Sequence, residues 1–420
     1  MRPVRLLLFL AALTGAAARA AEAPGGTSLT WDGAVAEAAR ANPALASSRL
    51  TVDVSRASYY SAFNAFLPGL SLSNSVGETS SARSPSWSAT ASAGITLFSV
   101  GSAASIRSAS ATLGSAEAAL RASSANLRSS LRQTFSSLLF AQESLATARA
   151  ILEIRKHDAE LVSLRYDSGR ESKGNMLRAK AQRMQAEYAV VSAERDVRTA
   201  QRDMARQLGR EGFEAFVATG AFASAPPPPQ PDDFRALLPL RTDVAIAAAA
   251  VDSSRAALLA ADSVLWPVLS ANYSRSRTGP TEFPSKSRSW SAGATLSYAL
   301  FGAGPTAAYY GTKASRLSLE RSESDLAAAR QSALSDLETA WSNYADASDQ
   351  VEVQDALLAA ARQRSDEADI RYGSGLLSFD IWEGIVSDRV STERQALSTR
   401  RAAMDAETAW HRALGRALGE

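Results

Sequence analysis

The sequence predicts a mainly α-helical fold built from two copies of one unit, in which long coiled-coil helices flank a single β-hairpin. Two stretches, Trp87–Gly101 and Trp290–Gly304, alternate apolar with small polar residues, and this period of two indicates strands. Apolar residues recur every seven positions in the segments that follow, which predicts coiled-coil packing. Pro68 and Pro267 lie 199 residues apart, and other landmarks keep nearly the same offset, which indicates an internal repeat.

The composition excludes several classes of chemistry. The 420 residues include no cysteine, so disulfides, thiolate metal sites and thiol nucleophiles are excluded. The two histidines, His157 and His411, lie far apart, and no nucleophile motif or glycine-rich phosphate loop is present. We therefore expect no enzyme activity, no cofactor and no metal site. The formal net charge of +2 gives no support to nucleic-acid binding.

The first residues read as an export signal. Arg2 and Arg5 precede the short apolar run Leu6–Leu13, and Ala18–Ala20 offers a small-residue cleavage site. These features predict a signal peptide over residues 1–20. No later stretch reaches 18 consecutive apolar residues, so we expect no membrane-spanning helix. An exported protein without such a helix is periplasmic, secreted or an outer-membrane barrel.

Residues 21–209 form the first predicted repeat. Thr30 is the expected N-cap of its first helix, Pro43 interrupts that helix, and Pro68 ends it. The next long helix holds no proline and carries the heptad pattern, and the glycine at Gly169 ends it. The expected elements are a helix over 31–66, strands over 69–77 and 87–98, and helices over 102–165 and 172–208.

Residues 210–233 are rich in Pro, Ala and Gly and are expected to form an extended linker with little core. The second repeat, residues 234–420, follows the order of the first. Its expected elements are a helix over 234–265, strands over 268–277 and 289–301, and helices over 306–371 and 378–415.

The strands are of the length and pattern that suit an outer membrane: about ten residues, one apolar face and an aromatic residue at the rim. The alternative is a half-buried strand of a soluble sheet. Four strands per chain cannot close a barrel, so spanning strands would require several chains, and three chains would supply twelve strands. The candidate lipid-facing residues are Trp87, Ala89, Ile95, Leu97, Trp290, Leu296, Tyr298 and Leu300.

Helix lengths lead to the same architecture. The helix over 102–165 would be about 95 Å long, whereas the helix over 172–208 would return only about 55 Å. The helix over 43–66, about 35 Å long, is expected to stack end to end with it and complete the column. Three chains would then form a hollow tube of helices that continues the barrel. Soluble antiparallel coiled coils are the alternative.

The chain resembles the TolC-like outer-membrane efflux protein family. The motifs that carry the resemblance are Leu29–Asp32, Ala34-Val35, Asn42-Pro43, Arg241–Asp243, the turns Tyr166–Gly169 and Tyr372–Gly375, and the endings Leu208-Gly209 and Leu414-Gly415. The resemblance implies a homotrimer in the outer membrane, with a twelve-stranded β-barrel and a long periplasmic α-barrel. It also implies passive export, either in a tripartite efflux pump or in type I secretion, with a periplasmic adaptor and an inner-membrane transporter as partners. A periplasmic coiled-coil adaptor is the alternative function.

The resemblance further implies that the two Tyr-x-x-Gly turns form a closed periplasmic tip. Family members often carry acidic residues at positions that here hold Ile381 and Gly384, and Asp380 and Glu383 each lie one place earlier. We treat both acids as candidate pore residues, with a solvated helix N-terminus as the alternative. Arg165, Tyr166, Arg371 and Tyr372 are candidate contacts that hold the tip closed, with ordinary helix C-terminal capping as the alternative.

Overall fold

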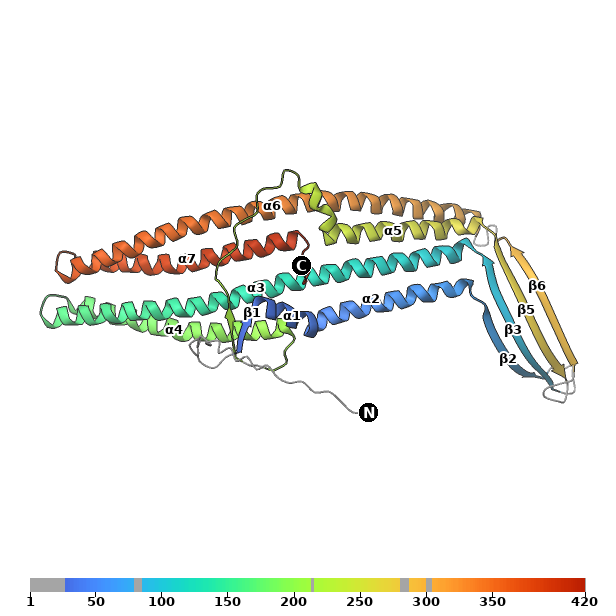
Figure 1. Cartoon of the computed structure of the whole chain (residues 1–420), viewed down its shortest axis with the longest axis horizontal. Helices are drawn as coiled ribbons and strands as arrows, with labels where there is room; N and C mark the ends of the chain where they lie inside the picture. Colours follow the sequence, from blue (N-terminus) through green and yellow to red (C-terminus); the bar gives the residue numbers. More distant parts are fainter. Residues whose placement is uncertain (1–26, 79–84, 213–214, 280–286, 300–303, 420) are drawn as a thin grey trace, which may run out of the picture.

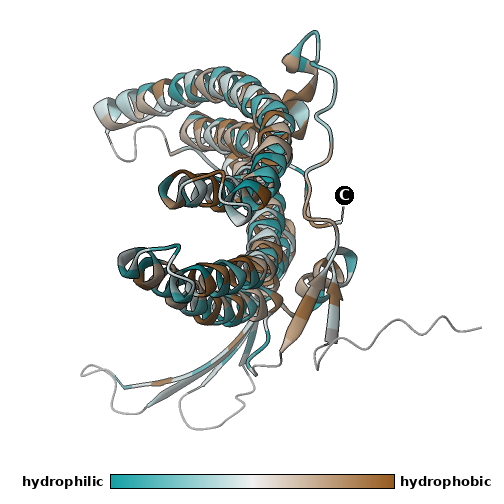
Figure 2. Cartoon of the chain, turned by 90° about the vertical axis from the view of Figure 1, so that its left-hand side faces the viewer, coloured by the Kyte–Doolittle hydropathy of each residue, from teal (hydrophilic) through white to brown (hydrophobic). Residues whose placement is uncertain are grey.

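A computed structural model describes residues 27–78, 85–212, 215–279, 287–299 and 304–419. The predicted signal peptide and Leu300 lie outside these residues. The chain is elongated, with a small sheet at one end and two helical turns at the other (Figure 1). Seen along the long axis from the end that carries the turns, its helices follow an arc that is open on one side (Figure 2).

Four helical columns lie side by side. Two are continuous helices of 68 and 69 residues, each about 100 Å long. The other two are each made of two helices stacked end to end. The continuous columns are α3 (Val100–Asp167) and α6 (Pro305–Gly373), and the composite ones are α2 (Pro43–Ala62) with α4 (Lys173–Leu208) and α5 (Thr242–Asp262) with α7 (Phe379–Ala413). Because α3 packs against all of α2, α4, α5 and α7, composite and continuous columns alternate.

The composite columns are joined through helix ends that touch. The side-chain amide of Asn42 donates to the carbonyl oxygen of Gln207 at 3.0 Å, which ties the start of α2 to the end of α4. Gly209 follows α4 with a φ of +79°, and a Cβ there would run into the carbonyl oxygen of Ala41. In the second repeat, Arg241 donates to the carbonyl of Ala413 at 3.0 Å. The expected end-to-end stacking of the 172–208 helix is therefore present.

The first helix is divided. The hydroxyl of Thr30 accepts from the backbone N–H of Gly33 at 3.2 Å, so the predicted N-cap is confirmed. Helix α1 (Trp31–Ala41) ends at Asn42, whose side chain caps α2 by accepting from the N–H groups of Ala44 and Leu45. The expected helix over 31–66 is thus two α-helices followed by a 3-10 turn, η1 (Phe63–Phe66), with the break at Pro43 where the sequence places it.

The four strands of the hairpins form one antiparallel sheet of order β2-β3-β5-β6. Their bounds are β2 (Gly69–Gly77), β3 (Ser86–Phe98), β5 (Val268–Gly279) and β6 (Ser287–Ser297). The last strand ends four residues earlier than expected, so Tyr298 lies just beyond it. Serine pairs bond across one face, at 2.7 Å for Ser71 with Ser92 and 2.8 Å for Ser274 with Ser291.

The segment 210–233 differs from the expected linker. It contains a short strand, β4 (Phe216–Thr219), which pairs in parallel with β1 (Thr27–Thr30). Phe216 and Ala218 are buried against α1, α3 and α4, and the side-chain amide of Gln142 exchanges two hydrogen bonds with the backbone of Ala218. The strand was missed because its apolar alternation is only four residues long and its partner lies almost 190 residues away.

One helical stretch, Thr242–Leu265, is long and apolar enough to cross a membrane by length and composition, contrary to expectation. It consists of α5 and the 3-10 turn η3 (Ser263–Leu265), and it follows the 3-10 turn η2 (Phe234–Leu240). Two features argue against insertion. It packs along α3 and α6 within the helical layer, and Arg255 in its middle pairs with Asp252 and with Glu323 of α6. Its high alanine content accounts for the hydropathy.

Candidate functional site

The candidate site lies where the two helical hairpins turn, at the end farthest from the sheet (Figure 1). Each turn contains a glycine with a positive φ, +73° at Gly169 and +81° at Gly375, a conformation that glycine adopts without steric cost. The two turns therefore bring the end of α3, the start of α4, the end of α6 and the start of α7 into one region.

Aromatic packing fastens α6 to α7. Tyr372, the last tyrosine of α6, is fully buried and stacks on Trp382 of α7 with ring centroids 4.3 Å apart and an interplanar angle of 6°. The indole N–H of Trp382 donates to the carboxylate of Asp369 at 2.6 Å, and the ring of Phe379 meets Tyr372 edge-on. Such pairs contribute about 1 kcal/mol each beyond the area they bury.

The α3–α4 hairpin contacts the same tyrosine, Tyr372. A guanidinium N–H of Arg165, at the end of α3, donates to the backbone carbonyl of Tyr372, and its Cζ lies 4.5 Å from the centre of the tyrosine ring. The Tyr372 hydroxyl donates to the carboxylate of Glu171 at 2.9 Å. Burial and this hydrogen bond raise the pKa of Tyr372 far above its usual value, so the hydroxyl remains a donor. Tyr372 is thus the contact point between the two hairpins.

A second link runs through Glu383 of α7, which is buried. Its carboxylate accepts from Gln182 of α4 at 2.5 Å and from Ser387 at 2.7 Å, and it pairs with Arg178 of α4 at 2.9 Å. Burial by itself raises the pKa of Glu383, but the hydrogen bonds of Ser387 and Gln182 and the nearby arginines outweigh it and leave the pKa lowered. Glu383 is therefore charged, and it joins α7 to α4 across the hairpins.

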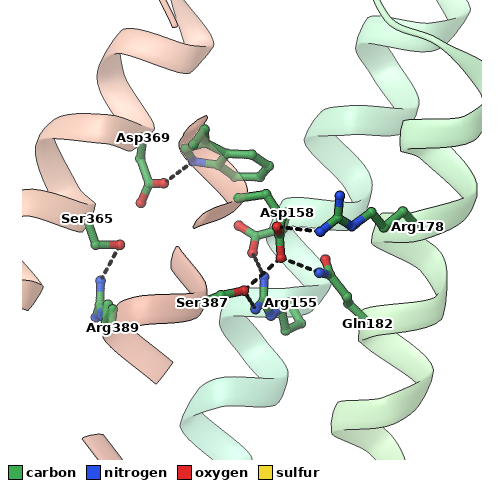
Figure 3. A network of polar contacts seen from close by, with 10 residues as sticks. Arg155, Asp158, Arg178, Gln182, Ser365, Asp369, Ser387 and Arg389 are labelled. Atoms are coloured by element: carbon green, nitrogen blue, oxygen red, sulfur yellow. Dashed lines mark hydrogen bonds and ion pairs between the residues drawn. The ribbon is translucent and has the colours of Figure 1, made fainter. Parts of the chain in front are cut away.

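A buried pair on α3 lies next to Glu383, with Ser387 as a shared neighbour, and Figure 3 shows its surroundings. Arg155 donates to Ser387 of α7 at 3.0 Å and lies 3.5 Å from Asp158. Burial raises the pKa of Asp158 to about 6, with Arg155 opposing the shift and the neighbouring Asp369 adding to it. Asp158 therefore changes charge near pH 6, at a point where α3 and α7 meet.

The structure separates the residues that the sequence grouped. Asp380 has a side chain that is 81% exposed, and it lies 3.6 Å from Arg178. Tyr166 is half-buried against the apolar cluster of the tip, which includes Trp382 and Phe379. Arg371 is exposed, and within the described part of the chain its side chain has no hydrogen-bond or ion-pair partner. Of the candidate contacts, Arg165 and Tyr372 meet each other, whereas Arg371 stays apart.

Sequence reasoning missed Arg155, Asp158 and Glu171. One signal was available for the pair on α3, because Asp158 follows the buried Ile151 by seven residues, which places an acid at a core position of the coiled coil. The sequence gives no signal for the role of Glu171, since it is a polar residue in a polar turn. Among the described residues, no group of three or more His, Cys, Asp or Glu side chains is arranged to hold a metal ion.

Comparison with known proteins assigns the family. A sequence profile of the family described as outer membrane efflux protein matches residues 34–210 and 235–416, which is most of both repeats. No curated protein matches the chain at a significant level.

Solved structures share the fold at low sequence identity. The outer-membrane channel OprN superposes with a TM-score of 0.80 at 20% identity, covering 92% of this chain and 90% of that chain. The outer membrane protein VceC from Vibrio cholerae gives 0.80 at 16% identity, covering 92% and 96%. The open state of the MtrE outer membrane channel of Neisseria gonorrhoeae gives 0.76 at 18% identity, covering 92% and 89%.

The family profile matches both repeats rather than a single helical hairpin, so the alternative function, a periplasmic adaptor, is not favoured. The similar structures are channels of the outer membrane with the same long helical body. The chain accordingly belongs to the outer membrane efflux protein family, and it is an efflux channel of the outer membrane with a large periplasmic portion.

Proposed function

We propose that three copies of this chain form one exit duct, with a twelve-stranded β-barrel in the outer membrane and a helical tunnel that reaches into the periplasm. The observation that carries the proposal is the open sheet. Its order β2-β3-β5-β6 leaves β2 and β6 as edges among the described strands. In lipid, unpaired backbone groups at an edge each cost several kcal/mol, so the edges need strands of neighbouring copies.

The two faces of the sheet support a water-filled barrel. One face carries the serine pairs, for example Ser71 with Ser92 and Ser276 with Ser289, which suit a polar lumen. The other face holds exposed apolar side chains, which suit lipid. The proposed lipid-facing residues described by the structure are Trp87, Ala89, Ile95, Leu97, Trp290 and Leu296, with Tyr298 just beyond the strand.

The internal repeat predicts how copies would join. Strand β5 repeats β2 with an offset of 199 residues and β6 repeats β3 with an offset of 203, and these offsets convert every pair of the first hairpin into a pair of the second. Applied to the pairing of Ser92 with Ser274 between β3 and β5, they place Thr295 of one copy opposite Ser75 of the next.

A disulfide cross-link between two introduced cysteines tests this register. Because the chain has no native cysteine, no other thiol can form a disulfide. In the Ser75→Cys/Thr295→Cys variant, mild oxidation should give a covalent trimer on non-reducing gels. The control, Ser75→Cys/Ser291→Cys, keeps both thiols on the same face but is displaced by four residues, about 13 Å, and should stay uncross-linked. Monomer alone from the first variant would refute the trimer, and equal cross-linking of both would refute the register.

The tip contacts support a gate at the far end of the duct. We infer that Arg165, Tyr372 and Glu383 hold the α6–α7 hairpin against the α3–α4 hairpin, while Asp380 is exposed and available to line the opening. The exposed Arg371 and the half-buried Tyr166 would serve in packing or assembly contacts. Asp380→Asn should lower cation selectivity in planar-bilayer conductance, because it removes one carboxylate per copy. Unchanged selectivity would remove Asp380 from the pore.

The partners follow from the proposed duct. A passive channel needs an energised transporter in the inner membrane and an adaptor that joins the two, in a tripartite pump or a type I secretion system. The length of α3 and α6, about 100 Å each, supports contact with such partners at the tip. A purification of the wild-type channel from cross-linked envelopes should recover an adaptor, and loss of the tip turns should abolish that recovery.

A further inference from the structure

Three arginines lie on the face of the sheet that holds mostly apolar residues. Arg275 and Arg277 belong to β5 and Arg288 to β6, and in the register Arg275 pairs with Trp290 while Arg277 pairs with Arg288. Side chains alternate between faces along a strand, so all three share the face of Tyr273 and lie opposite to the serine pairs. In the proposed barrel this face meets lipid.

The arginines lie near the end of the apolar band that is remote from the helices. In the register Arg275 stands opposite Ala91 and Arg277 opposite Ala89 of β3, and Trp87 lies two residues farther out. In β3 the band runs over eleven residues from Trp87 to Leu97, which spans about 25 Å of height for a strand tilted by about 40°. In β6 the apolar side chains begin at Trp290 and continue toward the helices, and Arg288 stands two residues beyond. Tryptophan favours the membrane–water interface, and Trp290 and Trp87 flank the level of the arginines along the strands, so the arginines lie near the outer headgroups.

These guanidinium groups have no counter-charge within the part of the chain that the structure describes, where none of the three makes a hydrogen bond or ion pair. Arg277 and Arg288 stand directly opposite each other, an arrangement of like charges that destabilises a sheet unless an anion lies between them. The sequence from Arg275 to Arg288 contains four basic residues and one acidic residue, so the local excess charge is positive.

The first repeat lacks this feature. By the repeat offsets, Val76 stands at the position of Arg275 and Glu78 at that of Arg277. The positive charge is therefore not required by the geometry of the hairpin, since the same geometry is built without it once in every chain. It marks one side of each copy and would recur three times around a trimer.

We propose that Arg275, Arg277 and Arg288 form a binding site for the phosphate groups of anionic lipid in the outer leaflet of the outer membrane. The inference rests on the proposed barrel, which turns this face toward lipid. Guanidinium groups match phosphate oxygens with two parallel hydrogen bonds, and the flanking Trp290, with 72% of its surface exposed, packs against the acyl chains below.

The test measures lipid binding to the purified trimer. The probe is a bisphosphorylated glucosamine lipid (lipid A), and native mass spectrometry counts the molecules retained as lipid concentration rises. Each arginine near an anionic lipid surface is worth about fivefold in affinity, so the triple variant Arg275→Gln/Arg277→Gln/Arg288→Gln should bind about 100-fold more weakly. The control, Arg316→Gln/Arg330→Gln/Arg394→Gln, removes equal charge from exposed helical positions and should bind as the wild type does.

Two further measurements separate phosphate recognition from a general effect of the substitutions. Wild-type protein should retain dephosphorylated lipid A far less than the bisphosphorylated form, a comparison that needs no variant. Lysine at the three positions should restore most of the affinity lost with glutamine. Equal retention of both lipids, or an equal loss in the helical control, would overturn the lipid site. The Ser75→Cys/Thr295→Cys cross-link on the same preparation reports the trimer separately, so a covalent trimer with unselective retention would refute this inference alone.

Discussion

Replacement of Glu383 by Gln should loosen the tip selectively. The carboxylate accepts from Ser387 and Gln182 and pairs with Arg178. Charge-assisted hydrogen bonds contribute about 1.5–3 kcal/mol each, but the Arg178 side chain is 53% exposed, so its ion pair is worth under about 1 kcal/mol. Gln keeps one carbonyl acceptor, so we expect a loss of about 2 kcal/mol.

Hydrogen exchange read by mass spectrometry measures this loss locally. A loss of about 2 kcal/mol corresponds to roughly 30-fold faster exchange in the first turns of α7, because every 1.4 kcal/mol is a factor of ten. Peptides of the sheet should be unaffected. Since the pKa of Glu383 is lowered, its stabilisation is present above the ordinary value of 4.5 and is lost as pH falls through the folded pKa. Wild type and variant should therefore converge in acid.

The matched control is Asp388→Asn on the same helix. Asp388 lies 3.8 Å from Arg364 with its side chain 58% exposed, and surface pairs of this kind contribute little. Exchange in α7 should change by less than about threefold. If Glu383→Gln and Asp388→Asn have equal effects, or if neither changes α7, the assignment of Glu383 as a link between the hairpins is wrong.

Two further predictions concern the tip and the column joints. The pKa of Asp158 is raised to about 6, so its stabilising contribution is present in acid and is lost as pH rises from about 4 through 6. Over this range the free energy of local opening at the tip, read by hydrogen exchange, should fall by up to about 3 kcal/mol in wild type but not in Asp158→Asn. Equal pH profiles for the two proteins would contradict this. Gly209→Ala should lower the apparent melting temperature more than Gly169→Ala, because both have a positive φ but a Cβ at Gly209 also meets Ala41; equal shifts would show that the joint tolerates the side chain.

Local signals made much of the fold predictable. Thr30, Pro43 and the turn glycines each act within a few residues, so their effects on helix ends follow from the sequence alone. The repeat extended this reach, because the pairing within one hairpin fixes the pairing within the other. The strand β4 escaped prediction because a four-residue strand is defined by its distant partner.

The position of the two turns was predictable, but the contacts between them were not. The tyrosine turns indicated the tip, yet Arg165 and Tyr372 are separated by 207 residues, and only the tertiary fold shows that they meet. Asp380 and Glu383 look equivalent in sequence, being three residues apart at one helix start. The structure makes them different, because α4 covers Glu383 and leaves Asp380 in solvent.

The breaks in the two composite columns have a mechanical consequence. Where α4 gives way to α2, the parallel pair β1–β4 packs beside the joint, and the side-chain amide of Gln142 of α3 bonds to the backbone of Ala218 in β4. Where α7 gives way to α5, Arg241 bridges to Ala413 and to Asp336 of α6. Each joint is thus held both by direct contact between the two helix ends and by contacts to neighbouring elements, so the two helices of a composite column are constrained to move together.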